Sequence, residues 1–570
     1  MDAPDAAPVS DLALGFQRLT FPWLGWVFAG ALVAGVACFV PIGDSDAGWH
    51  LALGRLIAQH GLPSTNALAW TARDVPWYDT SWLWDLASYA LTARFGLIGL
   101  QGLTFVAFGL ALWALGWACE KADPGRGAWL VPAIALLLVP RLTVRPHVAT
   151  WTGFAAVLAL CLASERGGWR WRAACIPVIA FAGNLHSGAP FAAGLLGLWC
   201  AQAFSRRSDL REAAIAAGGV LALCANPGLT FNLRSLVWHL RVQELVVIGE
   251  YLPPHPLVEP AFYLLLPLAL LLAWRVRRER PAVLASVVLF AALGLKAQRM
   301  VYEFEILIAP LLATGLAQVR ARHGVRLQAA VVLLATLLAG ASHRRLPATR
   351  LAPEWDPQKL PVRAVAFATQ QGIDGRLFNA YDDGGFLEWA QPGTPAFVDG
   401  RVQCFPAEFF RRFYSASHSP RDFQAWLREL DVEWAMPRRT SPWLSGRDLL
   451  HGPEWALVYW DNLNEVLLRR DVPRFAARIE RLEYRHFRPT GLVVGNVAAT
   501  PVAEVPALLA ELDRFAQTTP GDPLALVVRC AALSRAALAG SEEACARAEQ
   551  ATAGDENARR LVTKARALHR

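Results

Sequence analysis

A pair of carboxylates follows the first long apolar segment of the chain. Asp44 and Asp46 closely follow an apolar run over 21–41. A helix needs about 20 apolar residues to cross a bilayer, so this run is long enough. Acidic side chains beside a membrane are costly and usually mark a functional site. Repulsion within such a pair raises one of its pKa values, which favours base chemistry near neutral pH. We expect Asp46 to be a catalytic base, with Asp44 as its partner. Both could also bind Mg²⁺ or Mn²⁺, and the alternative is that the pair only caps the helix that follows.

Further polar side chains stand near the ends of later apolar segments, and their types fit the binding of a phosphate. We expect substrate contacts from His50, Arg141, Arg145, His147, Asn184, His186, Glu250 and Arg299. A guanidinium group can grip a phosphate in two places at once. Structural alternatives stay open: snorkelling for the arginines and a polar pair between helices for Asn184 and His186. His50 could equally make a structural hydrogen bond, and Glu250 could be the polar edge of a loop.

The composition predicts a membrane domain followed by a water-exposed part. Apolar residues make up 54% and charged residues 18% of the 570 residues, against about 25% charged in soluble domains. About eleven apolar segments are expected to be spans: 23–41, 97–118, 128–140, 148–164, 174–184, 189–204, 212–225, 260–274, 281–295, 303–319 and 326–342. We therefore expect a polytopic membrane domain over 23–342 and a soluble remainder.

Arginine-rich short loops alternate with loops that carry fewer basic residues, and this pattern predicts the orientation. The net charge of +8 lies largely in these short loops, which the positive-inside rule places in the cytoplasm. It therefore gives no reason to expect nucleic acid as a partner. We expect residues 1–22 in the cytoplasm and an outer loop over 43–96 with two helices lying on the membrane surface. The C-terminal part would then also lie outside.

The soluble part divides into two regions. Residues 343–470 alternate helix and strand signals, as in a small α/β domain. The expected elements are a helix at 361–371 and strands at 377–380, 395–398, 434–437, 455–460 and 465–469. Residues 471–570 are rich in Ala, Leu, Arg and Glu at helical spacing, so we expect a helical tail, with tetratricopeptide-like hairpins as one option. The nine cysteines show no paired spacing, and no metal–thiolate pattern is present.

A series of short motifs resembles a known superfamily. The run from Asp44 through Trp49-His50 to Gly54 resembles the first outer loop of bacterial proteins related to the GT-C glycosyltransferases, including protein mannosyltransferase-like and lipid A core glycosyltransferase-like enzymes. Further matches over residues 40–470 are Arg145-Pro146-His147, Asn184-Leu185-His186-Ser187-Gly188, Asn226-Pro227-Gly228, Glu250-Tyr251, Arg299, Phe378–Leu387 and Val398–Arg401. Two residues depart from the pattern. Gly48 replaces a commoner aromatic residue and is expected to loosen the loop, and Asp383 stands where an aromatic residue is usual.

The resemblance implies a GT-C fold: mainly α, polytopic, with an extracytoplasmic α/β domain and a helical tail, in a bacterial inner membrane. It implies transfer of a sugar from a polyprenyl-phosphate donor to an extracytoplasmic acceptor. In such enzymes an acidic residue of the first outer loop is the base or a metal ligand. Tyr381–Gly385 and Asp399–Arg401 are expected to be a structural turn with an Asp399–Arg401 contact, or else part of an acceptor-binding or lid module.

Two other functions are compatible with the sequence to different degrees. The chain could be an inactive GT-C relative that acts as a scaffold in cell-envelope polysaccharide assembly and binds envelope proteins through residues 471–570. A transporter is disfavoured, because the sequence shows no internal symmetry and the acidic pair lies at an edge of the membrane.

Overall fold

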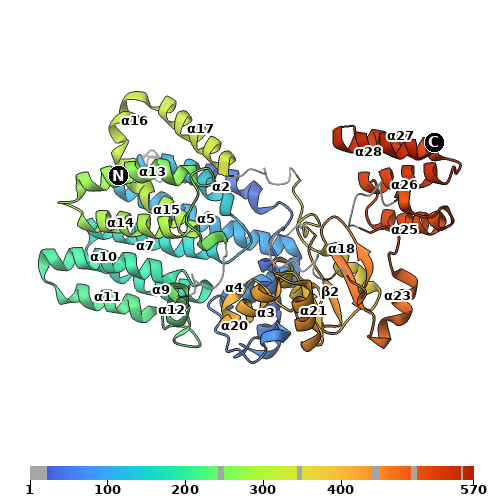
Figure 1. Cartoon of the computed structure of the whole chain (residues 1–570). Helices are drawn as coiled ribbons and strands as arrows, with labels where there is room; N and C mark the ends of the chain where they lie inside the picture. Colours follow the sequence, from blue (N-terminus) through green and yellow to red (C-terminus); the bar gives the residue numbers. More distant parts are fainter. Residues whose placement is uncertain are drawn as a thin grey trace, which may run out of the picture. The chain divides into compact units, whose positions relative to one another are not determined.

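The computed structural model shows a mainly helical protein with one small mixed sheet (Figure 1). It describes residues 22–241, 249–342, 350–439, 450, 452–488, 497–553 and 556–569. The expected cytoplasmic segment 1–22 therefore lies, except for its last residue, outside the described residues. The chain forms two compact units. The helical unit comprises Met1–Ile42, Leu53–Thr65 and Pro76–Glu354, and the α/β unit comprises Gly43–Ala52, Asn66–Val75 and Trp355–Arg570.

Each of the eleven apolar segments contains a helix. These helices are α2 (Pro22–Cys38), α5 (Leu97–Ala122), α6 (Val131–Leu138), α7 (His147–Gly167), α9 (Cys175–Leu185), α10 (Ala189–Arg207), α11 (Leu210–Ala222), α13 (Pro260–Val276), α14 (Pro281–Lys296), α15 (Val301–Gly315) and α17 (Val325–Ser342). The helical unit also holds α4 (Trp82–Phe95), α8 (Trp169–Ala173), α12 (Phe231–Arg241) and α16 (Ala317–His323). Apolar side chains from most of these helices form one continuous core, which explains why hydropathy alone located them.

Two of the described helices, α5 and α7, are long and apolar enough to cross a membrane by themselves. The other apolar helices, such as α13 and α14, are shorter. α5 packs along α7, and Phe108 and Trp151 meet edge to face with ring centroids 6.1 Å apart. The helices are thus where the sequence predicts them, while the number of crossings stays a prediction.

Helix α3 (Asp46–His60) starts earlier than the sequence suggested. The apolar spacing predicted a helix from Leu51, whereas the structure begins it at Asp46. It ends where expected, because Gly61 has a φ of 83° and adopts a left-handed conformation that favours glycine. The segment 43–96, expected as one outer loop, is divided: 43–52 and 66–75 belong to the α/β unit.

The α/β unit contains a four-stranded sheet in the order β1-β2-β4-β3. Its strands are β1 (Leu377–Asn379), β2 (Trp434–Met436), β3 (Trp455–Trp460) and β4 (Glu465–Arg469). β1 pairs parallel with β2, and the other two pairs are antiparallel. The expected helix is α18 (Val362–Gln370), which shares the core beneath the sheet. Four of the five expected strands are therefore confirmed.

The fifth strand, expected at 395–398, is wrong. This segment forms only an isolated parallel bridge between Ala69 and Ala396. The Asn379 side chain accepts a hydrogen bond from the Phe397 backbone at 2.7 Å and donates one to the Val398 carbonyl at 2.8 Å. A side chain thus satisfies the backbone groups that a neighbouring strand would otherwise pair.

Several elements of the α/β unit were not expected from the sequence. They are α19 (Gly384–Ala390), α20 (Ala407–Ala416) and α21 (Pro420–Glu429). The tail is helical as predicted, with α23 (Ala476–Leu482), α25 (Val505–Thr518), α26 (Pro523–Arg535), α27 (Ser541–Ala551) and α28 (Glu556–Arg566). α26 packs against α25, α27 and α28. A disulfide between Cys530 and Cys545 joins α26 to α27, although the spacing of the cysteines did not indicate a pair.

Candidate active site

The acidic pair forms the N-terminal turn of α3. Asp44 Oδ1 accepts a hydrogen bond from the Asp46 backbone N–H at 3.1 Å, and the Asp44 carbonyl accepts one from Ala47 at 3.3 Å. Asp44 therefore has the capping role that was the structural alternative. Asp46 is the first residue of the helix, where a negative charge interacts favourably with the helix dipole.

The turn that carries Asp46 lies against the start of α19 and against the loop that holds Gly400, both in the same unit. The Ser45 hydroxyl oxygen accepts a hydrogen bond from the Phe386 backbone N–H at 3.0 Å. A Cβ on Gly48 would overlap the Gly385 carbonyl oxygen, and a Cβ on Gly400 would overlap the Asp46 carboxylate. The expectation that Gly48 loosens the loop is therefore wrong, because its missing side chain allows close backbone packing.

A buried ionic network lies beside this turn. Arg401 contacts Asp399 through Nη2–Oδ2 at 2.6 Å and Nε–Oδ1 at 3.1 Å, and its Nη2 lies 3.2 Å from Glu388 Oε1. It also donates to Asn66 Oδ1 at 3.1 Å. The side chains of Arg401, Asp399 and Glu388 are at most 1% exposed. The predicted Asp399–Arg401 contact is thus confirmed, as part of a larger network.

The network separates the pKa values of its two carboxyl groups. Burial, and then the charge of Asp399, raise the pKa of Glu388 well above its ordinary value. Burial alone would raise the pKa of Asp399, but the Arg401 guanidinium and its hydrogen bonds outweigh it and lower that pKa. The arginine therefore makes Asp399 the more acidic carboxyl group of the network and Glu388 the less acidic one.

Asp383 is buried among polar side chains of the same unit. It is fully buried, accepts a hydrogen bond from Asn464 Nδ2 at 2.7 Å and lies 3.0 Å from Arg438 Nε. Burial raises its pKa to about 7, although Arg438 and Asn464 act in the opposite direction. Asp383, with its polar partners, therefore stands where an aromatic residue is usual in the family that the sequence resembles.

His50 lies on the same helix as Asp46. Its side chain is buried in the first turns of α3, and its ring lies directly beside that of Trp49. This burial agrees with the structural alternative for His50. It leaves the expected substrate contact a proposal.

The three arginines that are expected to bind a phosphate lie together in the helical unit. The carboxylate of Glu250 forms an ion pair with Arg141 and a second one with Arg145, whose Nη1 lies 3.5 Å away. The neighbouring residue Tyr251 accepts a hydrogen bond from Arg299 Nη1 at 2.6 Å, and the same guanidinium lies over its ring at 4.9 Å from the centroid. The short 3₁₀ helix η5 (Gly249–Tyr251) thus links all three arginines.

Histidines complete this cluster. His147 Nε2 donates to the Arg141 carbonyl at 2.9 Å, which orients the loop before α7. His186 Nδ1 and Thr150 Oγ1 are hydrogen-bonded at 2.6 Å. His186 also lies within electrostatic range of Arg145 and Arg299. The sequence reasoning missed Thr150, which carried no signal because it stands inside an apolar helix.

His239 on α12 is a further residue that was missed. Its ring centroid lies 5.8 Å from that of Tyr251, and His186 lies within its electrostatic range. Its spacing from other polar residues gave no signal in the sequence. We call the set Arg141, Arg145, His147, His186, His239, Glu250, Tyr251 and Arg299 the basic cluster.

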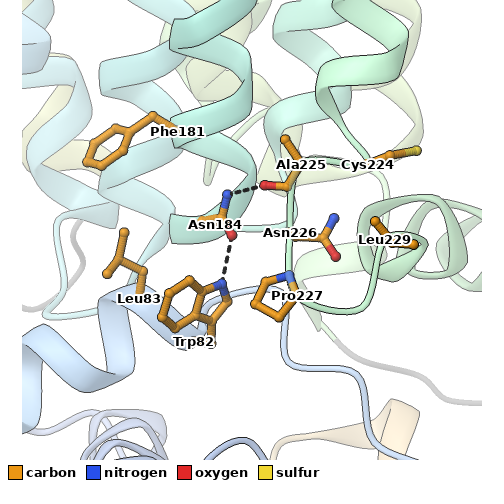
Figure 2. A pocket seen from close by; sticks show the side chains of 9 residues that line it. All are labelled: Trp82, Leu83, Phe181, Asn184, Cys224, Ala225, Asn226, Pro227 and Leu229. Carbon is orange, nitrogen blue, oxygen red and sulfur yellow. Dashed lines mark hydrogen bonds between the residues drawn. The ribbon is translucent and has the colours of Figure 1, made fainter.

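Asn184 lines a separate pocket of about 460 Å³ in the helical unit (Figure 2). Its Oδ1 accepts a hydrogen bond from Trp82 Nε1 at 2.7 Å, and its Nδ2 donates to the Ala180 and Ala225 carbonyls at 2.8 and 2.7 Å. Because these bonds occupy its amide, Asn184 matches the structural alternative, a polar link between helices. Figure 2 shows Trp82 and Asn184 pointing toward one another at the side of the pocket.

A divalent metal was expected as an option at Asp44 and Asp46. Within the described ranges no group of three His, Cys, Asp or Glu side chains could hold a metal ion. One oxygen of Asp44 is already used in capping. A metal at Asp44 and Asp46 stays a prediction, and no chemical step is derived through one.

Comparisons with known proteins show which solved structures have a similar fold. No protein-family model and no curated protein matches the chain. The archaeal oligosaccharyltransferase AglB from Archaeoglobus fulgidus, solved with an inhibitory peptide and a dolichol-phosphate, matches with a TM-score of 0.52 and 10% identity over 73% of this chain and 69% of that chain. The apo form of the Archaeoglobus fulgidus oligosaccharyltransferase gives 0.54 and 11% over 74% and 70%.

A bacterial structure is also similar. ArnT from Cupriavidus metallidurans, bound to undecaprenyl phosphate, gives a TM-score of 0.45 and 14% identity over 78% of this chain and 98% of that chain. The resemblance inferred from the short motifs is confirmed at the level of structure. The chain has a fold similar to that of the GT-C glycosyltransferases.

Proposed function

We propose that the protein is an integral-membrane glycosyltransferase that moves a sugar from a polyprenyl-phosphate donor to an extracytoplasmic acceptor. The observation that carries this proposal is the basic cluster, in which η5 draws three arginines of the helical unit together. Guanidinium groups fit a phosphate better than any other side chain. The fold similarity supports the same class of enzyme.

In the proposed reaction Asp46 removes the proton from the acceptor hydroxyl. The oxygen of that hydroxyl then forms a bond to the anomeric carbon of the sugar. The bond between this carbon and the phosphate oxygen breaks, and its electron pair leaves with the polyprenyl phosphate. Arg141, Arg145 and Arg299 would stabilise the charge that develops on the phosphate. His147 and His186 would orient these arginines, and Glu250 would pair with Arg141 and Arg145 until the phosphate replaces it. Asn184 would shape the helical unit, and His50, on the same helix as Asp46, would contact the substrate.

The proposed location is a bacterial inner membrane, with the α/β unit and the tail on the outer side. Helices α5 and α7 are long and apolar enough to cross a bilayer. The Cys530–Cys545 disulfide favours an oxidising compartment for the tail. The arginine-rich short loops favour the same orientation. Membrane lipids are then the main surroundings of the helical unit.

Asp46→Asn tests the proposal. The full-length protein is expressed in bacterial membranes, and the release of polyprenyl phosphate from polyprenyl-phosphate sugars is measured in the presence of envelope acceptors. We expect release to fall by at least about 100-fold, because a positioned general base contributes about 10²–10⁴-fold. Membrane insertion should be unchanged.

Asp74→Asn is the matched control, because Asp74 is an exposed carboxylate in the same unit. It should keep normal release. If wild-type membranes show release and Asp46→Asn retains it, Asp46 is not the base. If no donor is consumed and the tail captures envelope proteins, the scaffold function replaces the enzymatic one.

A further inference from the structure

The turn that carries Asp46 is packed against other segments of the α/β unit at three points. Ser45 accepts a hydrogen bond from the Phe386 backbone at 3.0 Å. A Cβ on Gly48 would overlap the Gly385 carbonyl oxygen, and a Cβ on Gly385 would overlap the Ser45 carbonyl oxygen. Both contacts involve the backbone of α19, and the second joins backbone to backbone, so they fix the position of the turn.

The third point is the contact between Asp46 and Gly400. A Cβ on Gly400 would overlap Oδ1 of Asp46 and crowd the rest of its carboxylate. Gly400 is not among the residues with a positive φ, so an alanine could adopt its backbone conformation. The glycine is therefore required for space, and the space that it leaves is occupied by the carboxylate of the proposed base.

The two chain neighbours of Gly400 are joined by a buried ion pair. Its neighbours Asp399 and Arg401 form the buried pair with contacts at 2.6 and 3.1 Å, and Arg401 extends to Glu388 and Asn66. The Arg401 guanidinium also lies 5.8 Å from the centre of the Trp49 ring, three residues beyond Asp46. Burying such charges carries a large desolvation cost, and precise geometry is one benefit that can offset it.

We propose that the Asp399–Gly400–Arg401 turn is the positioning element of the active site, with Gly400 as the residue that sets the orientation of the Asp46 carboxylate. The inference deepens the proposed function, because it takes Asp46 as the base. It assigns to the α/β unit a part in the chemical step itself, in addition to any binding of the acceptor. Orientation matters at this level because a displacement of about 1 Å can cost about 100-fold in rate.

The first test measures the contact without reference to activity. Gly400→Ala, Asp46→Ala and the double variant of the full chain are purified in detergent, and their melting temperatures are compared. We expect Gly400→Ala to lower the melting temperature in the wild-type background and to have no further effect in the Asp46→Ala background. Residues in direct contact show such non-additivity, whereas distant ones do not.

Gly393→Ala is the matched control, since a Cβ there meets nothing within 4 Å. It should be neutral in both backgrounds. If Gly400→Ala lowers the melting temperature equally in both backgrounds, the contact with Asp46 is absent and the inference fails. If neither background responds, the inference fails as well.

The second test uses donor consumption. Gly400→Ala should lower kcat by about 100-fold, as expected for a misplaced base, with little change in KM for the donor. It should cause no additional loss in the Asp46→Asn background. A rise in KM at constant kcat would overturn the positioning role. If the wild type consumes no donor, the proposed function fails, and the melting temperatures alone decide whether the turn holds Asp46.

Discussion

Glu511 accepts a hydrogen bond from the backbone N–H of Phe487 at 2.6 Å. The same carboxylate accepts from the N–H groups of Arg485 at 2.8 Å and His486 at 3.0 Å. Phe487 also packs edge to face on Phe515, at 5.1 Å between ring centroids. One buried side chain of α25 therefore ties this helix of the tail to the segment that follows α23.

Glu511→Gln should loosen this connection. An amide places N–H groups against donors that a carboxylate satisfies, and hydrogen bonds to charged groups are worth about 1.5–3 kcal/mol. We expect faster hydrogen–deuterium exchange in peptides covering 485–487 and 505–518, with the sheet unchanged. Glu480→Gln, at an exposed position on α23, is the control and should not alter exchange. Unchanged exchange in Glu511→Gln would mean that the aromatic contacts alone hold the tail.

The sequence located elements whose signal is local. Each apolar run in the sequence corresponds to a helix of the helical unit. These helices are apolar because most of them contribute side chains to one buried core. β3 and β4 were found for a related reason: buried strands read as short apolar runs between turn signals. The false strand at 395–398 had the same local signal, and only the fold shows that Asn379 satisfies its backbone.

The sequence predicted which types of residue form the candidate site, but it did not predict which of them contact one another. Arg141 and Glu250 are distant in the sequence, so their ion pair depends on the fold of the helical unit. The contact between Asp46 and Gly400 depends on the fold of the α/β unit in the same way. Thr150 and His239 stand inside helices with no distinguishing pattern, so no local rule would have selected them. The roles expected for Asp46, Arg141 and Glu250 in catalysis and binding remain predictions.

Glu250→Gln should strengthen phosphate binding by the basic cluster. In the structure the Glu250 carboxylate pairs with donors of Arg141 and Arg145 that a phosphate would also use. Removing this negative charge should tighten the binding of polyprenyl phosphate by roughly tenfold, which corresponds to about 1.4 kcal/mol. Binding to the detergent-solubilised protein can be measured by isothermal titration calorimetry.

Two comparisons make the Glu250 result specific. Glu279→Gln, an exposed carboxylate elsewhere in the helical unit, should bind as the wild type does. Arg145→Gln should bind more weakly, because it removes a guanidinium. Weaker binding in Glu250→Gln would show that the carboxylate holds the arginines in place for the ligand and does not compete with it.

Asp383 should make the stability of the α/β unit depend on pH. Its pKa is raised to about 7 in the folded protein, against about 3.9 for an unperturbed aspartate. Between these values the folded state binds more protons than the unfolded state, so its stabilising effect is complete below about pH 4 and is lost as the pH rises through 7. Glu388, with its raised pKa, contributes in the same direction.

Asp383→Asn isolates this contribution, because the other titrating groups are common to both proteins. The difference in melting temperature between variant and wild type should shift in favour of the variant on going from pH 5.5 to pH 8.5. Melting curves in matched buffers measure it, with Asp74→Asn as an exposed control. A difference that is constant across this pH range would show that Asp383 does not change its protonation state between pH 5.5 and pH 8.5.

The disulfide should respond to both reductant and compartment. Cys530 and Cys545 are separated by 15 residues and join α26 to α27. In the chain-entropy account a loop of this size contributes about 3 kcal/mol to the free energy of unfolding. Cys530→Ala and Cys545→Ala should therefore expose α26 and α27 to proteolysis. The buried thiols of the helical unit, such as Cys161 and Cys200, should give stable proteins when changed to alanine.

Alkylation in intact cells then tests where the tail lies. Cells are quenched in acid and denatured, and free thiols are blocked before reduction and labelling with a maleimide that adds mass. An extracytoplasmic tail should show two labels that appear only after reduction, because disulfides persist in oxidising compartments and are rare in the cytosol. The Cys530→Ala variant should lose both labels, since Cys545 then has no partner. Two thiols already reduced in the cell would place the tail in the cytosol, where it could not act on an extracytoplasmic acceptor.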